Sequence, residues 1–598
     1  MKGELVVSIY KQPLCITMIK KLAQYIKEYK LPTIITPILI TLEVIMEVII
    51  PLKMADLIDY GVYAGNMNEV WKLGVTLIIL AMLSLFFGAT NGISAAKASA
   101  GFAKNLRKEL YYKVQDFSFS NIDKFSSASL VTRLTTDVTN VQQAFQMLIR
   151  IAVRAPLMFI VSVIAALQIN ASLAGIFLAA IPILAIAVFA IMRRSHPIME
   201  KTFKMYDNLN NVVEENVSSI RVVKSFVLED EEKNKFKNVS NTIFGNFVKA
   251  EKMMALISPI MQTASYTCVI LVSWLGARII VESNMTTLKT GELMTLLTYS
   301  IQILSSLMML AMVALMLTIS RASAERIVEV LDEVPDIKNP ENPVMTVKNG
   351  DIEFKNVSFS YVKDKEKECL KEINLKIKSG ETIGVIGGTG SGKSSLVNLI
   401  PRLYDTTEGE VLVGKVNVKK YDLDTLRNEV ACVLQKNVLF SGTVSENIRW
   451  GNEDATDEEV ERVCKLAQAD DFVKAFPKGY QTYIEQGGTN VSGGQKQRLC
   501  IARALLKKPK ILILDDSTSA VDTKTDALIR KAFKEEIPNT TKIIIAQRIN
   551  SVEDADKIIV MDGGKINGFG KHEELLKNNE IYKEVYESQM KGSDSDEK

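Results

Sequence analysis

One segment of the sequence has the composition and spacing of a phosphate-binding loop. Within ETIGVIGGTGSGKSS, Gly387, Gly392, Lys393 and Ser394 fit G-x-x-x-x-G-K-[ST], after an apolar run and before a helix expected near Ser394. Glycine-rich backbone lets successive N–H groups close around phosphate oxygens. We expect Lys393 to neutralise the β- and γ-oxygens of a nucleoside triphosphate and Ser394 to coordinate Mg²⁺. The predicted contact residues of this Walker loop are Gly387, Gly388, Thr389, Gly390, Ser391, Gly392, Lys393, Ser394 and Ser395.

Two further groups of residues downstream suit the same chemistry. Residues 511–514 are apolar, which predicts a buried strand, and Asp515 follows them in a position to hold Mg²⁺ through water. Ser492, Gly493, Gly494 and Gln495, here called the signature motif, precede a predicted helix over 496–505 and form a second phosphate-binding nest. One chain folded alone would present two such sites facing different ways. Two domains placed head to tail would pair each Walker loop with the other's signature motif and enclose two nucleotides.

The first half of the chain has a different composition. Charged residues make up 24% of the sequence although the mean hydropathy is +0.12, because long apolar runs are concentrated before about residue 344. A membrane span needs about 20 mostly apolar residues. The predicted spans are 31–51, 73–93, 151–170, 171–192, 255–281 and 291–317. The net charge of +3 is too small to indicate a nucleic-acid partner.

The distribution of basic residues predicts the orientation of these spans. The connections after the second and fourth spans are long and rich in Lys and Arg, whereas the other three are short and poor in them. Both long connections and both termini should therefore face the cytoplasm. Ahead of the first span, residues 18–30 would form a helix with one apolar face and basic residues elsewhere, as is typical of a helix that lies in the membrane interface. The long connections show helical periodicity and should extend below the bilayer as continuous helices.

In order, these motifs resemble an ATP-binding-cassette (ABC) exporter over essentially the whole chain, from Met18 to Met590. The resemblance implies a multidomain fold: an all-α six-helix transmembrane domain with long cytoplasmic extensions, then an α/β P-loop nucleotide-binding domain with a helical subdomain. It also implies ATP and Mg²⁺ as ligands, a second half-transporter chain, and a lipid bilayer. The expected domains are an N-terminal segment (1–30), the transmembrane domain (31–325), a linker (326–344), the cassette (345–590) and a disordered acidic tail (591–598).

The resemblance assigns further roles. Tyr361 matches the aromatic residue that stacks on adenine, and Gln435 matches a glutamine that contacts Mg²⁺ between the cassette and the helical extensions. Ser519 and Asp522 match a loop that contacts the second cassette. The family's coupling helices, which form the tips of the helical extensions, are expected near residues 121–127 and 205–210.

Two positions depart from the family pattern. Asp516 stands where a catalytic glutamate is usual, and Gln547 stands where a histidine is usual. Asp is one methylene shorter than Glu, which puts its carboxylate roughly 1–1.5 Å further from the attacking water and can cost about 10²-fold in rate. Gln can hydrogen-bond a phosphate but cannot become cationic or shuttle a proton. The Walker loop is therefore expected to bind ATP and hydrolyse it slowly.

The signature motif matches the family except for Val491, where leucine is usual. A weak catalytic position beside a competent signature motif is similar to the degenerate-site subunit of heterodimeric bacterial multidrug exporters. The alternative is that Asp516 and Gln547 are neutral changes in a slow homodimer. The segment before the signature motif also departs, with Gln486-Gly487 where Glu-Arg is common.

Candidate contacts with a transported molecule lie in the first and last spans. Glu43 and Glu47 are four residues apart and share one helix face. They could attract cationic amphiphiles, or they could make a polar contact with another helix or the outer water. Met308 and Met312 share a face of the last span and suit promiscuous binding, although core filling or lipid contact explains them as well.

The leading hypothesis is ATP-driven export of small molecules that are drug-like, amphipathic, lipid or peptide. An ATP-gated channel remains open as an alternative, whereas an importer is disfavoured because importers usually carry the two domain types on separate chains. A nucleic-acid ATPase is excluded by the six spans. With no recognisable targeting segment, the expected location is a bacterial cytoplasmic membrane.

Overall fold

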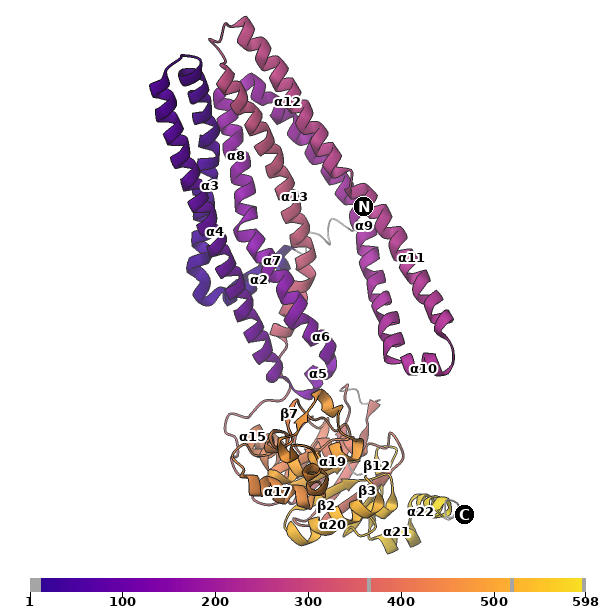
Figure 1. The fold of residues 1–598 in the computed structure, drawn as a ribbon. Coiled ribbons are helices and arrows are strands. Elements are labelled where there is room, and N and C mark those ends of the chain that lie inside the picture. Colours follow the sequence, from indigo (N-terminus) through magenta and orange to yellow (C-terminus); the bar gives the residue numbers. More distant parts are fainter. Residues whose placement is uncertain (1–11, 363–366, 517–520, 594–598) are drawn as a thin grey trace. The chain divides into compact units, whose positions relative to one another are not determined.

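The computed structural model describes residues 12–362, 367–516 and 521–593, and they form two units. One unit contains the helices up to Gln115 together with Ala128–Asp332. The other contains Asp116–Ser127 and the described residues from Glu333 onward (Figure 1). The first unit is helical and the second is α/β, which confirms the predicted fold class.

The described part of the helical unit begins with a broken helix, and six long apolar helices follow or continue from it. Among the described residues, six helices are long and apolar enough to cross a membrane, which confirms the six predicted spans. The elements are α2 (Gln12–Ala23), η1 (Gln24–Tyr29), α3 (Lys30–Asp56), η2 (Leu57–Val62), α4 (Met67–Gln115), α6 (Ser127–Thr132), η3 (Arg133–Asp137), α7 (Val138–Ile149), α8 (Ile151–Ile169), α9 (Ala171–Ser218), α10 (Ile220–Ser225), α11 (Glu229–Met254), α12 (Ile257–Glu282) and α13 (Thr290–Asp332).

The third and fourth spans form a hairpin at Asn170. The side chain of Asn170 accepts a hydrogen bond from the backbone N–H of Leu173 at 3.1 Å and so caps α9. Helix α13 continues to Asp332, past residue 325, where the sequence analysis ended the transmembrane domain.

Helices α4 and α9 run uninterrupted from the spans into the long connections, whereas breaks at Arg150 and at residues 255–256 separate α7 from α8 and α11 from α12. One predicted tip is wrong. Residues 205–210 lie inside the uninterrupted helix α9, and the chain reverses instead at the short helix α10, between α9 and α11 (Figure 1). Helical periodicity continues through residues 205–218, so the pattern could not show where the helix ends. The other predicted tip, 121–127, overlaps the short helix α5 (Phe119–Phe125), which groups with the cassette.

Pro51 in the first span leaves a backbone carbonyl that a neighbouring helix satisfies. Pro51 has no N–H to donate to the carbonyl of Glu47 four residues earlier. The amide of Gln302 in α13 donates to that carbonyl at 3.4 Å, and Tyr299 Oη donates to the carbonyl of Val48 at 2.7 Å. In a bilayer these groups have no water to bind, so α13 completes the hydrogen bonding of α3.

The α/β unit contains three sheets. The largest has the strand order β12-β11-β3-β10-β9-β6, and β12 is antiparallel to its neighbour whereas the other pairs are parallel. The strands are β3 (Thr382–Gly387), β6 (Val430–Val433), β9 (Ile511–Asp515), β10 (Thr541–Ile545), β11 (Lys557–Asp562) and β12 (Lys565–Gly570). An antiparallel sheet, β2-β1-β4-β5, contains β1 (Ile352–Phe359), β2 (Leu370–Ile377), β4 (Glu408–Val413) and β5 (Val416–Asn417), and β7 (Gly442–Thr443) pairs with β8 (Tyr483–Ile484).

Helices connect the strands and form a helical subdomain. Two apolar cores, one on each side of the large sheet, are contributed partly by the alternate faces of its strands. The helices are α14 (Lys393–Asn398), η5 (Val418–Lys420), α15 (Leu423–Glu429), α16 (Val444–Arg449), α17 (Asp457–Leu466), α18 (Asp470–Lys474), η6 (Gly479–Gln481), η7 (Gln486–Gly488), α19 (Gly493–Leu506), α20 (Thr523–Glu536), η8 (Ile549–Ser551), α21 (His572–Asn578) and α22 (Glu580–Ser593).

An ion pair joins the last helix of the helical unit, α13, to η3. Asp137 is 1% exposed and accepts two hydrogen bonds from the guanidinium of Arg326, at 2.8 and 2.5 Å. Asp137→Asn should lower the free energy of unfolding by about 1–2 kcal/mol, because a buried charge-assisted contact is lost. Thermal unfolding of the purified membrane protein measures this. The matched control is Glu325→Gln, which breaks an exposed pair with Arg321 and should change stability by less than about 0.5 kcal/mol. Equal effects of the two substitutions would contradict the prediction.

Candidate active site

Four predicted site segments follow four adjacent parallel strands. The Walker loop follows β3, Gln547 follows β10 closely, Asp515 ends β9 with Asp516 next to it, and Gln435 follows β6 closely. The carboxyl ends of parallel strands lie at one edge of a sheet, where open α/β folds bind their ligands. The strand order β3-β10-β9-β6 therefore brings these residues together, although they span 387–547 in the sequence.

The Walker loop needs its glycines for space and conformation. A Cβ atom on Gly387 would lie 2.2 Å from the carbonyl oxygen of Met561 in the adjacent strand. Gly392 has a φ of +96° and is the N-cap of α14, a left-handed conformation that other residues rarely adopt. The loop thus passes close to β11 and turns directly into the helix, with its backbone available for phosphate oxygens.

Lys393 is held inside its own loop. Its ammonium Nζ donates to the carbonyls of Gly387 and Gly388, both at 2.8 Å. Burial lowers the pKa of Lys393, and the nearby charges of Asp515 and Asp516 oppose that shift. The ammonium is therefore fixed at the loop by neutral carbonyls, which phosphate oxygens would replace with stronger charge-assisted contacts.

Ser394 and Asp515 form a pair suited to a hard cation. Asp515 is 5% exposed, and burial raises the pKa of its carboxyl group while the nearby Ser394 hydroxyl opposes the shift. Hydroxyl and carboxylate oxygens are the ligands Mg²⁺ prefers, so these two residues with Gln435 fit the expected ion. No group of three or more His, Cys, Asp and Glu side chains in the described residues could hold a metal by itself. The nucleotide would have to supply the remaining ligands, and Mg²⁺, when bound, would neutralise charge on its phosphates.

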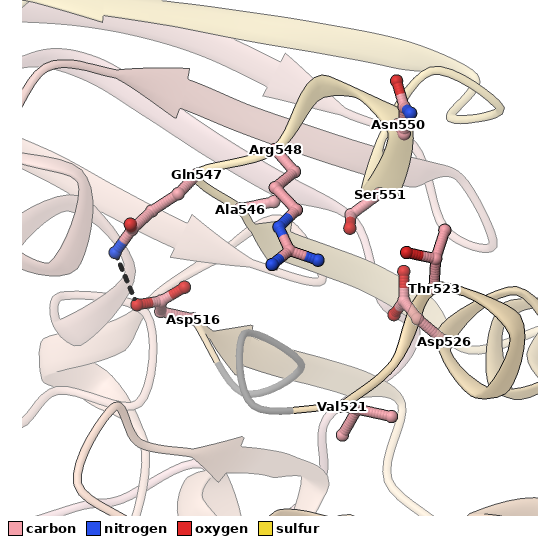
Figure 2. A pocket seen from close by; sticks show the side chains of 9 residues that line it. All are labelled: Asp516, Val521, Thr523, Asp526, Ala546, Gln547, Arg548, Asn550 and Ser551. Atoms are coloured by element: carbon pink, nitrogen blue, oxygen red, sulfur yellow. Dashed lines mark hydrogen bonds between the residues drawn. The ribbon is translucent and has the colours of Figure 1, made fainter. Parts of the chain in front are cut away.

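The two positions that depart from the family pattern contact each other. The amide nitrogen of Gln547 donates to Oδ2 of Asp516 at 2.7 Å (Figure 2). The side-chain amide of Gln435 also lies close enough to favour the charged form of Asp516. Burial raises the pKa of Asp516, and these two amides oppose the rise. The carboxylate is thus hydrogen-bonded by Gln547, at the edge of a cavity of about 150 Å³.

The backbone of Asp516 is also unusual. Its φ is +50°, in the left-handed region that aspartate tolerates better than most residues, and its N–H donates to the carbonyl of Ile545 at 3.1 Å. This conformation turns the chain out of β9 immediately after Asp515. The sequence identified Asp515 by its place after an apolar run and Asp516 by the family resemblance, but not this turn.

A residue of the C-terminal helix holds the segment that carries Gln547. The side-chain amide of Gln589 in α22 donates to the carbonyl of Gln547 at 2.8 Å, and its oxygen accepts from the N–H of Ile549 at 2.9 Å. This two-point contact fixes the backbone on both sides of Arg548. The sequence analysis missed Gln589, because no motif marks it.

Comparisons with known proteins agree with this geometry. The family model described as the ABC transporter transmembrane region matches residues 33–308. A second family model, described as ABC transporter, matches residues 370–519. The chain is 36% identical over 578 residues to the uncharacterized ABC transporter ATP-binding protein YfiB of Bacillus subtilis (strain 168), covering 96% of this chain and 100% of that protein. It is 30% identical over 576 residues to YfiC of the same organism, covering 96% and 94%. The chain belongs to the ABC transporter family.

A solved structure supports the same architecture. The structure described as a bacterial Atm1-family ABC exporter with ATP bound superposes with a TM-score of 0.79 at 22% identity, covering 94% of this chain and 98% of that one. The likeness shows the fold. With its transmembrane region fused ahead of one cassette, this ABC protein is a half-transporter of the exporter type. ABC exporters of this kind work as dimers in a membrane and couple ATP to transport.

The signature motif of this ABC half-transporter begins a helix. Ser492 is the N-cap of α19: its Oγ accepts from the N–H of Gln495 at 3.3 Å, and the Gln495 side chain accepts from the N–H of Ser492 at 2.9 Å. Ser492 and Gly493 are exposed, so the positive end of α19 faces solvent. Ser519 lies outside the described residues, and Asp522 caps α20 by accepting from the N–H of Thr525 at 2.9 Å.

A chain of aromatic rings extends from Tyr361. Its hydroxyl lies 3.0 Å from that of Ser395 in the Walker loop, and its ring meets Tyr404 edge-on at 5.0 Å. Tyr404 in turn donates to the carboxylate of Asp123 in α5 at 2.8 Å and lies 6.0 Å from the ring of Phe119. The residue expected to stack on adenine is therefore packed through one tyrosine against the predicted coupling helix.

Removal of the Gln589 contact should loosen the Gln547 segment selectively. In Gln589→Ala, the N–H of Ile549 loses its acceptor, and its hydrogen exchange should accelerate by roughly five- to tenfold, the equivalent of about 1 kcal/mol. Hydrogen–deuterium exchange of peptides spanning 546–552 measures this change. Ser588→Ala, on an exposed position of the same helix, is the control and should leave the exchange unchanged. Unaltered exchange in Gln589→Ala would show that α22 does not hold this segment.

Proposed function

We propose that this chain is one subunit of a heterodimeric ABC exporter that moves small molecules across a bacterial cytoplasmic membrane. Its own Walker loop binds ATP with Mg²⁺ and hydrolyses it slowly, while its signature motif completes the active site of a partner subunit. The observation that carries the proposal is the 2.7 Å hydrogen bond between Gln547 and Asp516. It joins the two side chains on which hydrolysis would depend.

In this proposal ATP is bound by residues that match the family pattern. Lys393 exchanges its two carbonyl partners for phosphate oxygens, and the backbone N–H groups of 387–395 surround the phosphates. Ser394, Asp515 and Gln435 would hold the ion, and the Ser394 hydroxyl favours the charged form of the Asp515 carboxylate. Tyr361, 44% exposed and beside Ser395, offers its ring to the adenine.

Slow hydrolysis follows from the surroundings of Asp516. A general base must reach the attacking water, and the shorter Asp side chain reaches less far than Glu. Burial raises the pKa of Asp516, but the nearby amides of Gln547 and Gln435 oppose that rise and so limit the basicity that burial would confer. Gln547 donates hydrogen bonds but carries no proton that it can exchange near neutral pH.

The signature motif favours a partner subunit whose Walker loop differs from the one in this chain. The start of α19 is exposed and well capped, as a site for the phosphates of a second subunit's nucleotide requires. A homodimer would join two slow Walker loops to two competent signature motifs. A heterodimer would place at least one complete catalytic site against this motif. The bacterial origin of the relatives supports a cytoplasmic membrane as the location.

Purification from the native membrane tests the partnership. The chain should co-purify with a second half-transporter, and ATP hydrolysis should be weak for this chain alone and at least about tenfold faster for the pair. Lys393→Ala in this chain should reduce the rate of the pair less than the equivalent change in the partner does. Equal, strong hydrolysis by this chain alone would support the homodimer and contradict the proposal.

Restoring the usual family residues should raise hydrolysis at this chain's own site. Asp516→Glu with Gln547→His should increase its rate, by up to about 10²-fold if reach and proton transfer are limiting. The measurement uses the pair with the partner's catalytic carboxylate neutralised, so that the remaining rate belongs to this site. Ser551→Ala, beside the same cavity, is the control and should leave the rate unchanged. A double variant no faster than the parent would show that slow hydrolysis has another cause.

A further inference from the structure

The two carboxylates of the first span share one guanidinium. Arg154 in α8 donates from Nη1 to Glu43 at 2.6 Å and from Nη2 to the two oxygens of Glu47 at 2.6 and 2.9 Å. The sequence analysis left two explanations for these glutamates, and the structure shows the polar contact with another helix. It missed Arg154, which lies within an apolar run and belongs to no motif. With short contacts to both carboxylates, the cluster carries one more negative charge than positive charge.

The two glutamates have different surroundings. Glu43 is 8% exposed, accepts a further hydrogen bond from the amide of Asn91 at 3.2 Å, and lies where Gly88 leaves room for it. Glu47 is the more exposed of the pair and lines a cavity. Because Glu43 is buried and bonded to both Arg154 and Asn91, the surplus charge is accessible through Glu47.

The cavity beside Glu47 has a volume of about 480 Å³ and is bounded by α3, α8 and α13. This size lies in the range of sites for drug-sized ligands. Its walls combine apolar side chains, Ile50, Met158, Ile301 and Met309, with the uncharged polar Gln302 and Ser305. Glu47 and Arg154 are its charged lining residues. Met308 and Met312, which were expected to contact a substrate, are exposed and lie outside this lining. Their neighbour Met309 contributes to it.

We propose that this cavity binds lipophilic organic cations, with Glu47 as the residue that selects their charge. The cation contacts Glu47 while its apolar body lies against Ile50, Met158, Ile301 and Met309, and Arg154 keeps its contact with Glu43. An anion would have to compete with two carboxylates for Arg154 and would meet the surplus negative charge. This assignment of a substrate class rests on the proposed function as an exporter.

Two ions of nearly the same shape and opposite charge provide the test. Binding of tetraphenylphosphonium and tetraphenylborate to the full-length chain, with the subunit that co-purifies with it, is measured in lipid nanodiscs by equilibrium dialysis. Empty nanodiscs of the same lipid give the background of partition into lipid. The parent protein should bind the phosphonium more tightly than the borate above that background.

Matched variants separate charge from shape. Glu47→Gln keeps the side-chain size and leaves Arg154 paired with Glu43, so the helices retain a balanced ion pair. It should weaken phosphonium binding by about tenfold or more, because a unit charge at contact distance is lost in a poorly solvated site. Glu47→Asp should retain most of the binding. Glu282→Gln, at the exposed end of α12 where Glu282 pairs with Arg278, should match the parent.

Three results would overturn the proposal: equal phosphonium binding by Glu47→Gln and the parent, tighter binding of tetraphenylborate by the parent, or equal loss of both ions in Glu47→Gln. No nucleotide is present in these measurements. Failure here therefore leaves the ATP hydrolysis of the pair unaffected, and failure of the heterodimer assay leaves the binding result standing.

Discussion

A carboxylate that leaves water must find donors, and each unit of this protein contains a pair of neighbouring carboxylates with donors close by. In the cassette, Asp515 ends β9 near the hydroxyl of Ser394, and Asp516 follows it and accepts a hydrogen bond from Gln547. In the helical unit, Glu43 and Glu47 share Arg154. Because the desolvation cost of each group is large, the partners fix the positions of the elements that carry them. Loss of a donor would leave a buried charge unpaired, which explains why distant segments meet at these points.

The two pairs differ in what balances their charge. The membrane pair has one full positive charge from Arg154, whereas the amides at Asp516 are neutral and Lys393 faces the site from its own loop. Neutral donors position a carboxylate without neutralising it, so the cassette keeps its negative charge for an incoming cation. The membrane pair is half neutralised by Arg154, because a bilayer tolerates little net charge. The residual charge there is confined to the position that borders a cavity.

Much of this fold follows from patterns that are local in sequence. Long apolar runs predicted the six spans, and the glycine spacing predicted a loop that the structure places between β3 and α14. The contacts that refine the site are between residues far apart in the chain. Arg154 was hidden in an apolar run, and Gln589 lies 42 residues from the segment it holds. The misplaced coupling helix has the same origin, since periodicity reports which face is buried but not where a long helix ends.

The hydrogen-bonding capacity of Gln547 offers a physical reason why the proposed slow site would retain ATP. A side-chain amide nitrogen carries two hydrogens, so Gln547 can donate one to Asp516, as observed, and the other to a γ-phosphate. Histidine in this position would donate one hydrogen from the nitrogen that faces the phosphate, and it would change charge near neutral pH. The glutamine therefore bridges the carboxylate and the phosphate without supplying or removing a proton. Such a bridge stabilises the bound triphosphate more than the transition state, and binding of that kind favours retention of ATP over its turnover.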